Sequence, residues 1–170
     1  MKNISIIVCC DERGGFAKNK QIPWIKEDFS KIDLSNFQKL TTGNTIIMGR
    51  NTYDEIAGLR PIKLDLLPNR TSFVVTSNPK RKCKGTRTFA SLAQAIEKAK
   101  TDVFVIGGYQ LFVEAMSLCN KMHISFINHN YECDQFFPGE LIDDSWNINY
   151  HEAIPNKLLF AEYTKKNNTI

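Results

Sequence analysis

The sequence of 170 residues predicts an α/β fold in a single domain, residues 1–170. We expect a central, mostly parallel β-sheet with antiparallel strands at the C-terminal end and about four flanking helices. Two observations support this. Residues 4–10 are a continuous apolar run, typical of a strand buried on both faces of a parallel sheet. Apolar, strand-like runs then alternate with helical patterns along the chain.

The segment after the first strand predicts a loop and then a helix. Residues 11–20 are rich in glycine and charge, which indicates a loop, and an aromatic anchor, Trp24, closes it. Residues 26–40 carry apolar side chains at spacings of three and four, which predicts a helix or a turn followed by a helix. Asp33 and Phe37 are four residues apart, so a carboxylate and an aromatic ring share one face of this helix.

Residues 41–56 predict a strand, a tight turn and a helix N-terminus. An apolar run at 45–48 is followed by Gly49, and a helical pattern opens at Arg50. Unpaired backbone N–H groups at a helix N-terminus attract anions, so a guanidinium there suits a phosphate. The alternative is an ordinary turn with a solvated Arg50 and a capping Thr52, and this segment alone does not decide between them.

The remaining elements follow from turn residues and periodicity. Residues 58–70 predict a long loop, and residues 71–76 a strand. Ser91 is the predicted N-cap of a helix that continues through residue 99. A short strand at 102–106 leads through Gly107 and Gly108 into a helix at 109–116. A strand at 122–127 and antiparallel finishing strands complete the chain.

Composition and charge give no indication of a nucleic-acid-binding, metal-binding or membrane protein. The net charge of +4 is modest, so nucleic-acid binding is not implied. The five cysteines show no metal-ligand spacing, and the three histidines are scattered, so we expect free thiols, a reducing compartment and no metal site. The first residues are too short an apolar run for a signal peptide. We expect a cytoplasmic monomer without a membrane span.

Several motifs in order resemble the dihydrofolate reductase family from end to end. The first strand precedes GGFAKNKQIPW at residues 14–24, which is similar to the family's mobile loop, and DLSNFQKLT at 33–41 resembles its helix with the catalytic carboxylate. IIMGRNTY at 46–53 resembles the cofactor-phosphate turn, LPNR at 67–70 the folate-tail contact, VIGG at 105–108 the nicotinamide glycines, and DQFFP at 134–138 the closing strand. The ordered combination is more specific than any single motif.

The resemblance implies NADPH-dependent reduction of dihydrofolate and assigns residues to the substrate. The implied catalytic residues are Asp33, which supplies the carboxylate, Ile22 and Trp24. Arg70 is the implied partner of the glutamate tail, because its guanidinium matches a carboxylate bidentately. The implied substrate-binding residues are Ile7, Cys9, Asp33, Phe37, Thr41, Ile56, Leu67, Arg70 and Ser125. The family also binds antifolate inhibitors, so this chain is an implied antifolate target.

The resemblance also assigns residues to NADPH. Arg50 and Ser77 are implied to favour the extra phosphate that distinguishes NADPH from NADH. The implied cofactor-binding residues are Cys9, Ala17, Ile22, Gly49, Arg50, Asn51, Thr52, Thr76, Ser77, Ile106, Gly107, Gly108, Tyr109, Gln110, Leu111 and Phe112. Simple core packing is the alternative for Phe37, Ile56 and Ile106.

The sequence departs from the family pattern at several positions. Ala17 and Asn69 stand where the family usually has glycine, and Phe112 where tyrosine is usual. About four additional residues precede Asp33, so Asp28 is a rival for the catalytic role, although Phe37 and Thr41 follow Asp33 at the family spacing. Two other functions remain open: a pterin or riboflavin-pathway reductase of the same fold, and a folate- or nucleotide-binding protein with weakened catalysis.

Overall fold

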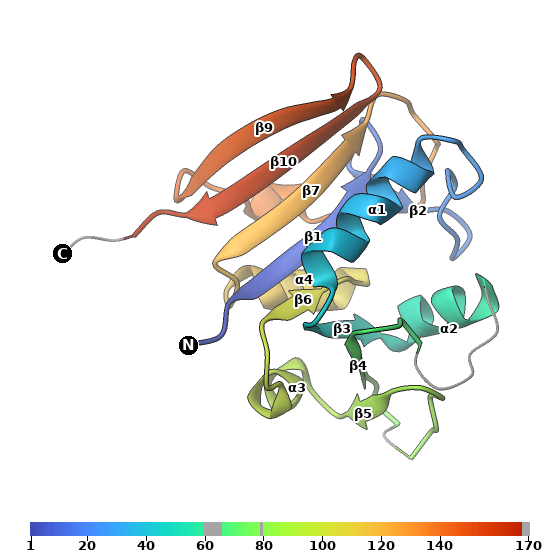
Figure 1. The fold of residues 1–170 in the computed structure, drawn as a ribbon, viewed down its shortest axis with the longest axis vertical. Helices are drawn as coiled ribbons and strands as arrows, with labels where there is room; N and C mark the ends of the chain where they lie inside the picture. The colour runs from blue at the N-terminus through green and yellow to red at the C-terminus, as the bar shows by residue number, and fades with distance from the viewer. Residues whose placement is uncertain (60–65, 79, 168–170) are drawn as a thin grey trace.

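The computed structural model describes residues 1–59, 66–78 and 80–167. Within these residues eight strands form one sheet in the order β5-β4-β3-β6-β1-β7-β10-β9 (Figure 1). The strands are β1 (Ile4–Cys10), β3 (Thr45–Gly49), β4 (Thr71–Val75), β5 (Arg87–Phe89), β6 (Val103–Val105), β7 (Lys121–Ile127), β9 (Trp146–Ile154) and β10 (Leu158–Lys165). The pairs from β5 to β7 are parallel, and β10 is antiparallel to both β7 and β9. The predicted mixed sheet is confirmed.

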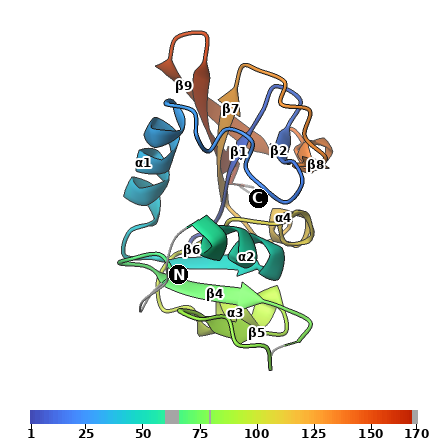
Figure 2. The same ribbon diagram turned by 90° about the vertical axis from the view of Figure 1, so that its right-hand side faces the viewer.

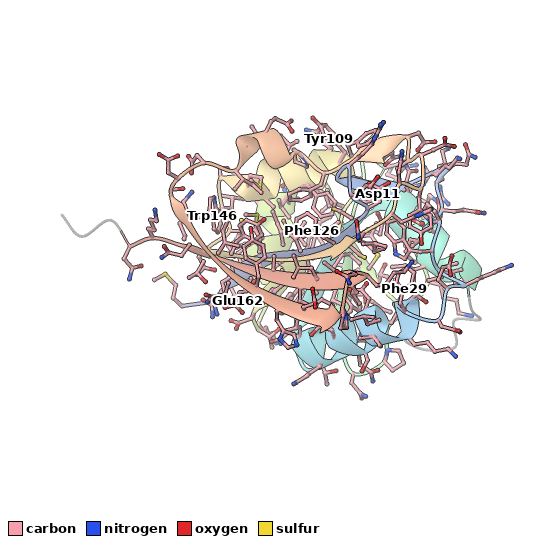
Figure 3. All side chains as sticks on the ribbon, turned by 90° about the horizontal axis from the view of Figure 1, so that it is seen from above. Asp11, Phe29, Tyr109, Phe126, Trp146 and Glu162 are labelled. Carbon is pink, nitrogen blue, oxygen red and sulfur yellow. The ribbon has the colours of Figure 1, made fainter. Side chains whose placement is uncertain are left out.

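Helices cover both faces of the sheet. The α-helices of the described residues are α1 (Ser30–Thr41), α2 (Arg50–Leu59), α3 (Leu92–Lys98) and α4 (Tyr109–Met116). Figure 2 shows α1 and α4 on opposite sides of β1. Figure 3 gives the same relation from above, with Phe29 close to α1 and Tyr109, the first residue of α4, across the sheet. No helix in the described ranges is long and apolar enough to span a membrane.

The largest hydrophobic cluster lies on the α3 and α4 face. Ile6 of β1 and Phe112 of α4 are fully buried in it. The ring of Phe112 meets Phe16 at 5.3 Å and Phe137 at 5.1 Å between centroids, both edge-on. A smaller cluster under α2 holds Ile46 and Leu67. This packing fixes the strands whose C-terminal ends carry the predicted site.

Local signals identified most elements at their observed positions. Residues 4–10 form β1 and residues 109–116 form α4. Ser91 caps α3, because its side-chain oxygen accepts a hydrogen bond of 3.2 Å from the backbone N–H of Gln94. The helix predicted within residues 26–40 begins at Ser30, after a stretch of turns.

Two short strands were not expected from the sequence. β2 (Gly15–Ala17) lies inside the predicted loop at 11–20 and pairs with β8 (Gln135–Phe136). The buried carboxylate of Asp11 organises this loop by accepting hydrogen bonds of 2.9 Å from the N–H groups of Arg13 and Gly15. β5 pairs with β4 at the sheet edge. Both strands have three residues, too few for an alternating pattern, and distant partners stabilise them.

The long loop predicted at 58–70 lies partly outside the described residues. Its first two residues, Gly58 and Leu59, belong to α2 instead, because the helix continues to Leu59. Residues 60–65 lie outside the described residues. Near the C-terminal end of the chain, a short 3-10 helix at Gly139–Leu141 precedes the hairpin formed by β9 and β10.

Candidate active site

A cleft of about 840 Å³ opens between α1, α2 and the strands at the centre of the sheet. Parallel strands bring their C-terminal ends to one edge, where α/β proteins bind ligands. The cleft collects many of the predicted site residues from distant parts of the chain. Those in its wall are Ile7, Cys9, Ile22, Trp24, Asp33, Phe37, Thr52, Ile56, Leu67, Arg70, Ile106 and Ser125.

Asp33 lies in the wall of this cleft, and two side chains on the sheet hold its carboxylate. Ser125 Oγ donates a hydrogen bond of 2.6 Å to Asp33 Oδ1. Cys9, paired with Ser125 across β1 and β7, is also a hydrogen-bond partner of Asp33. Burial raises the pKa of Asp33, and these hydrogen bonds oppose the shift by stabilising the charged form. The carboxylate is thus oriented and partly desolvated.

The rival carboxylate, Asp28, occupies a different environment. Asp28 is exposed in the turns before α1 and is not part of the cleft wall. Its neighbour Phe29 is buried, and Ser30 begins the helix. One turn further on, Asp33 faces the sheet, so the helix geometry separates the two carboxylates.

Arg70 lies at one end of the cleft in a fixed orientation. Its Nη1 donates a hydrogen bond of 3.3 Å to Thr41 Oγ1, and its Nε donates one of 3.0 Å to the carbonyl of Pro68. The guanidinium carbon is 5.7 Å from the ring centroid of Phe37. Thr41 is fully buried and is not in the cleft wall, so it supports Arg70 from behind. These contacts orient the guanidinium before any ligand arrives.

Asn69, which precedes Arg70, adopts the backbone conformation for which the family usually has glycine at this position. Its φ is +63°, in the left-handed region that glycine enters freely and asparagine tolerates better than most residues. Ala17 behaves differently. It is buried in β2 and is not among the residues with positive φ, so its methyl group fits the strand without strain.

Two strand-to-helix turns meet beside the cleft. The N–H of Gly49 donates a hydrogen bond of 2.7 Å to the carbonyl of Gly107. The peptide bond between Gly107 and Gly108 is cis, and the φ of Gly107 is +119°. A Cβ on Gly107 would lie 3.1 Å from the ring of Phe112 and 3.6 Å from Thr52 Oγ1. Only glycine fits this backbone, because a side chain on Gly107 would meet Phe112 and would hold a strained φ.

Positive charge gathers at the start of α2. Arg50 Nε lies 3.5 Å from Asp54 Oδ2, and Arg81 Nη2 lies 3.2 Å from Asp54 Oδ1. Thr76 and Ser77 directly follow β4, whose last residue Val75 is the register partner of Gly49. The sheet therefore brings the predicted phosphate-binding residues together. Arg81 belongs to a basic run near Lys80 that the sequence associates with the cofactor phosphate, but it is not among the predicted site residues, because its proximity to Arg50 depends on the chain returning to α2.

Several predicted cofactor residues lie outside the cleft wall. Leu111 and Phe112 are buried in the core on the α4 face. Tyr109 and Gln110 are exposed at the start of α4, and Asn51 is exposed near the start of α2. Phe112 thus packs in the core, although the resemblance assigned it to the cofactor. Its ring occupies the space that a Cβ on Gly107 would need, so it requires glycine at that position.

Glu55 is a cleft residue that the sequence reasoning missed. It lines the wall beside Ile56, and burial raises its pKa to about 7. The spacing from Thr52 contained the signal, since residues three apart share one face of a helix. The motif at residues 46–53 includes Arg50 and Thr52 but ends before Glu55.

The site suits a phosphate-bearing cofactor better than a metal ion. The described residues contain no cluster of three or more histidine, cysteine or acidic side chains that could hold a metal. Arg50 lies at the N-terminus of α2, where unpaired backbone N–H groups favour the binding of an anion. The glycine turn at Gly107 and Gly108 follows Ile106, which lines the cleft, so it adjoins the space where a cofactor ring would lie. These residues fit a nicotinamide dinucleotide.

The family model for dihydrofolate reductase matches residues 3–164. The chain is 32% identical over 174 residues to the dihydrofolate reductase of Bacillus subtilis, covering 98% of this chain and 96% of that protein. A dihydrofolate reductase of Staphylococcus aureus is 32% identical over 145 residues, covering 85% and 83%. The solved structure of the enzyme from Enterococcus faecalis, in complex with NADP(H) and the compound RAB-propyl, superposes with a TM-score of 0.79 at 26% identity over 96% of each chain. The chain belongs to the dihydrofolate reductase family.

Proposed function

We propose that the cleft reduces 7,8-dihydrofolate to tetrahydrofolate with NADPH and that Asp33 is its catalytic carboxylate. NADPH-dependent dihydrofolate reduction is the activity of the family to which the chain belongs. The observation that supports Asp33 is its setting, since Ser125 fixes it at 2.6 Å in a wall shared with Trp24 and Phe37. A partly desolvated carboxylate in a cleft is a candidate for proton chemistry.

The cofactor, when bound, supplies a hydride to the pterin ring. The chain must therefore orient the ring, exclude water and assist its protonation. Asp33 accepts hydrogen bonds from the ring N–H and amino groups and raises the proton affinity of the ring system. Ile22 and Trp24 shield the reacting faces, because both line the cleft near Asp33.

The two ends of the ligands are recognised by separate arginines in this proposal. Arg70, held by Thr41 and Pro68, binds the α-carboxylate of the glutamate tail. Arg50, with Thr76 and Ser77 beside it, holds the adenosine phosphate of NADPH. The glycine turn at Gly107 borders the nicotinamide. These assignments extend the family resemblance to positions that the fold brings together.

Some wider properties are part of the same proposal. We infer a single domain, supported by the continuous sheet, and a monomer that acts in the cytoplasm. Five free cysteines support a reducing compartment. The enzyme supplies tetrahydrofolate for one-carbon metabolism, and its cleft accepts antifolate inhibitors.

The test is the loss of NADPH absorbance on adding dihydrofolate, compared with a dihydropterin that lacks the glutamate tail. We expect turnover of dihydrofolate. In Arg70→Leu the KM for dihydrofolate should rise by about tenfold or more, the effect of losing a charge-assisted bond, while the KM for the tail-less pterin stays near its wild-type value. Binding without turnover would favour a non-catalytic protein, and an equal effect on both substrates would show that Arg70 supports the fold.

A further inference from the structure

One face of α2 forms a wall of the cleft. Thr52, Glu55, Ile56 and Leu59 all line it, and their spacing of three, four and seven residues places them on one stripe of the helix. Glu55 is the titratable member of this stripe. A carboxylate among apolar neighbours requires an explanation, because burying a charge without a partner is costly.

Glu55 has an unsatisfied carboxylate oxygen. Its Oε1 is buried, and within the described parts of the chain it has no hydrogen-bond partner. Burial raises the pKa of the carboxyl group to about 7. The other buried side-chain oxygen without a partner in these ranges is Ser72 Oγ on β4, which is not in the cleft wall. Unlike Ser72, Glu55 is placed where a bound molecule can supply the missing donor.

The position of Glu55 along the cleft indicates which part of a ligand it meets. One turn earlier, Thr52 stands beside the backbone of Gly107, at the end proposed for the nicotinamide. The next residue, Ile56, packs in one cluster with Leu67 and Phe37, toward the end where Arg70 lies. Glu55 therefore faces the middle of the cleft. The other charged or titratable side chains in the wall are Cys9, Asp33, Arg70, His123, Tyr150, His151 and Glu162.

We propose that Glu55 is a specificity-determining residue whose carboxylate accepts a hydrogen bond from the N–H that links the pterin ring to the benzoyl group of the substrate. This inference rests on the proposed function, which places the ring at Asp33 and the tail at Arg70. The linking N–H lies between these two groups in dihydrofolate. It is a donor in the part of the ligand that must pass Glu55. A methyl group on that nitrogen would remove the donor and leave Glu55 unsatisfied.

The experiment compares two diaminopteridine inhibitors that both carry the benzoylglutamate tail and differ only in hydrogen or methyl on the linking nitrogen. Dissociation constants are measured by calorimetry at pH 8, above the pKa of about 7, so that Glu55 is ionised. In the wild type the N–H inhibitor should bind more tightly than the N-methyl inhibitor. In Glu55→Met, similar in size without an acceptor, this ratio should fall by about 10- to 100-fold, as expected for a charge-assisted hydrogen bond. Glu55→Gln, which keeps an oxygen acceptor, should retain part of the preference.

The matched control is Glu97→Gln, an exposed carboxylate on α3, which should leave the ratio unchanged. An unchanged ratio in Glu55→Met would overturn the inference. A weaker affinity for NADPH with an unchanged inhibitor ratio would also overturn it, because the donor would then belong to the cofactor. Turnover of dihydrofolate by the wild type is measured in parallel. Its absence would refute the proposed function, whereas normal turnover with an unchanged ratio would refute only the role of Glu55.

Discussion

Ser125 Oγ donates a hydrogen bond of 2.6 Å to Asp33 Oδ1, which joins β7 to α1 in the wall of the cleft. Cys9, the register partner of Ser125, bonds the same carboxylate. Burial and these bonds act in opposite directions on the pKa of Asp33, and burial has the larger effect. The carboxylate of Asp33 is thus partly desolvated and is oriented by side chains of the sheet.

Asp33→Asn should keep the fold and lower kcat by about 100- to 10,000-fold, the range for a positioned proton-transfer group. The amide cannot supply the charge that raises the proton affinity of the pterin ring. The deficit should shrink at low pH, where solvent protonates the substrate. Steady-state kinetics across pH measure both effects.

Asp28→Asn is the matched control for this prediction. Asp28 is exposed and outside the cleft wall, so the kcat of the Asp28→Asn variant should stay close to the wild-type value. If Asp28→Asn lowered kcat strongly and Asp33→Asn did not, Asp28 would be the catalytic carboxylate instead of Asp33.

Ser125→Ala should raise the pKa of Asp33 further. The hydroxyl bond stabilises the ionised carboxylate, so its loss favours the protonated form. Titration of the Asp33 carboxyl carbon by NMR measures the shift, and the pH profile of kcat/KM should move in the same direction. Ser72→Ala removes a buried hydroxyl that has no partner among the described residues, and it should move neither. A downward shift in Ser125→Ala would contradict the assigned contact.

Arg50→Ala should weaken NADPH binding by about tenfold or more while NADH binding changes little, because a charge-assisted bond to the extra phosphate is lost. Fluorescence titration with both cofactors measures the difference. Equal losses would place Arg50 away from that phosphate.

Asp54→Asn should have the opposite effect. The Asp54 carboxylate contacts both Arg50 and Arg81, so it competes with an incoming phosphate. Its neutralisation should tighten NADPH binding by about two- to fivefold, which corresponds to the free energy of an exposed ion pair. The gain should disappear at high salt, which screens these charges. Weaker NADPH binding would mean that Asp54 orients the arginines.

Glu55→Gln should stabilise the protein at pH 8 and leave its stability unchanged at pH 4. Burial raises the pKa of Glu55 from 4.5 to about 7, so the folded protein binds the proton more tightly than the unfolded chain. The stability that this proton provides is complete below pH 4.5 and is lost as the pH rises through 7. The full shift corresponds to about 3 kcal/mol, which partial exposure reduces to about 1 to 2 kcal/mol. Urea unfolding at both pH values measures the effect, and an equal gain at pH 4 would exclude titration as its cause.

Local patterns anticipated much of the fold, and the exceptions share a cause. The apolar run of β1 and the periodicity of α4 are properties of neighbouring residues, so the sequence predicted their bounds. β2 has three residues and depends on pairing with β8, which lies far along the chain. No local pattern encodes such a partner.

The candidate site divides along the same line. Motif order predicted site roles for Asp33, Arg50 and Arg70, because each lies at a fixed spacing from a turn or an aromatic residue. The sequence predicted that Ser125 and Thr41 belong to the site. It did not predict that Ser125 bonds Asp33, that Thr41 bonds Arg70, or that Asp54 pairs with Arg50.

The sequence by itself determined the class of fold, the order of the main strands and helices, and the residue types available for chemistry. Only the tertiary structure decided that Asp33 rather than Asp28 lies in the cleft, that Phe112 belongs to the core, and that Glu55 has a buried oxygen without a partner in the described chain. The physical reason is that periodicity and turn chemistry act between neighbours. Burial and hydrogen-bond satisfaction depend instead on strand register and helix placement, which bring together residues far apart in the sequence.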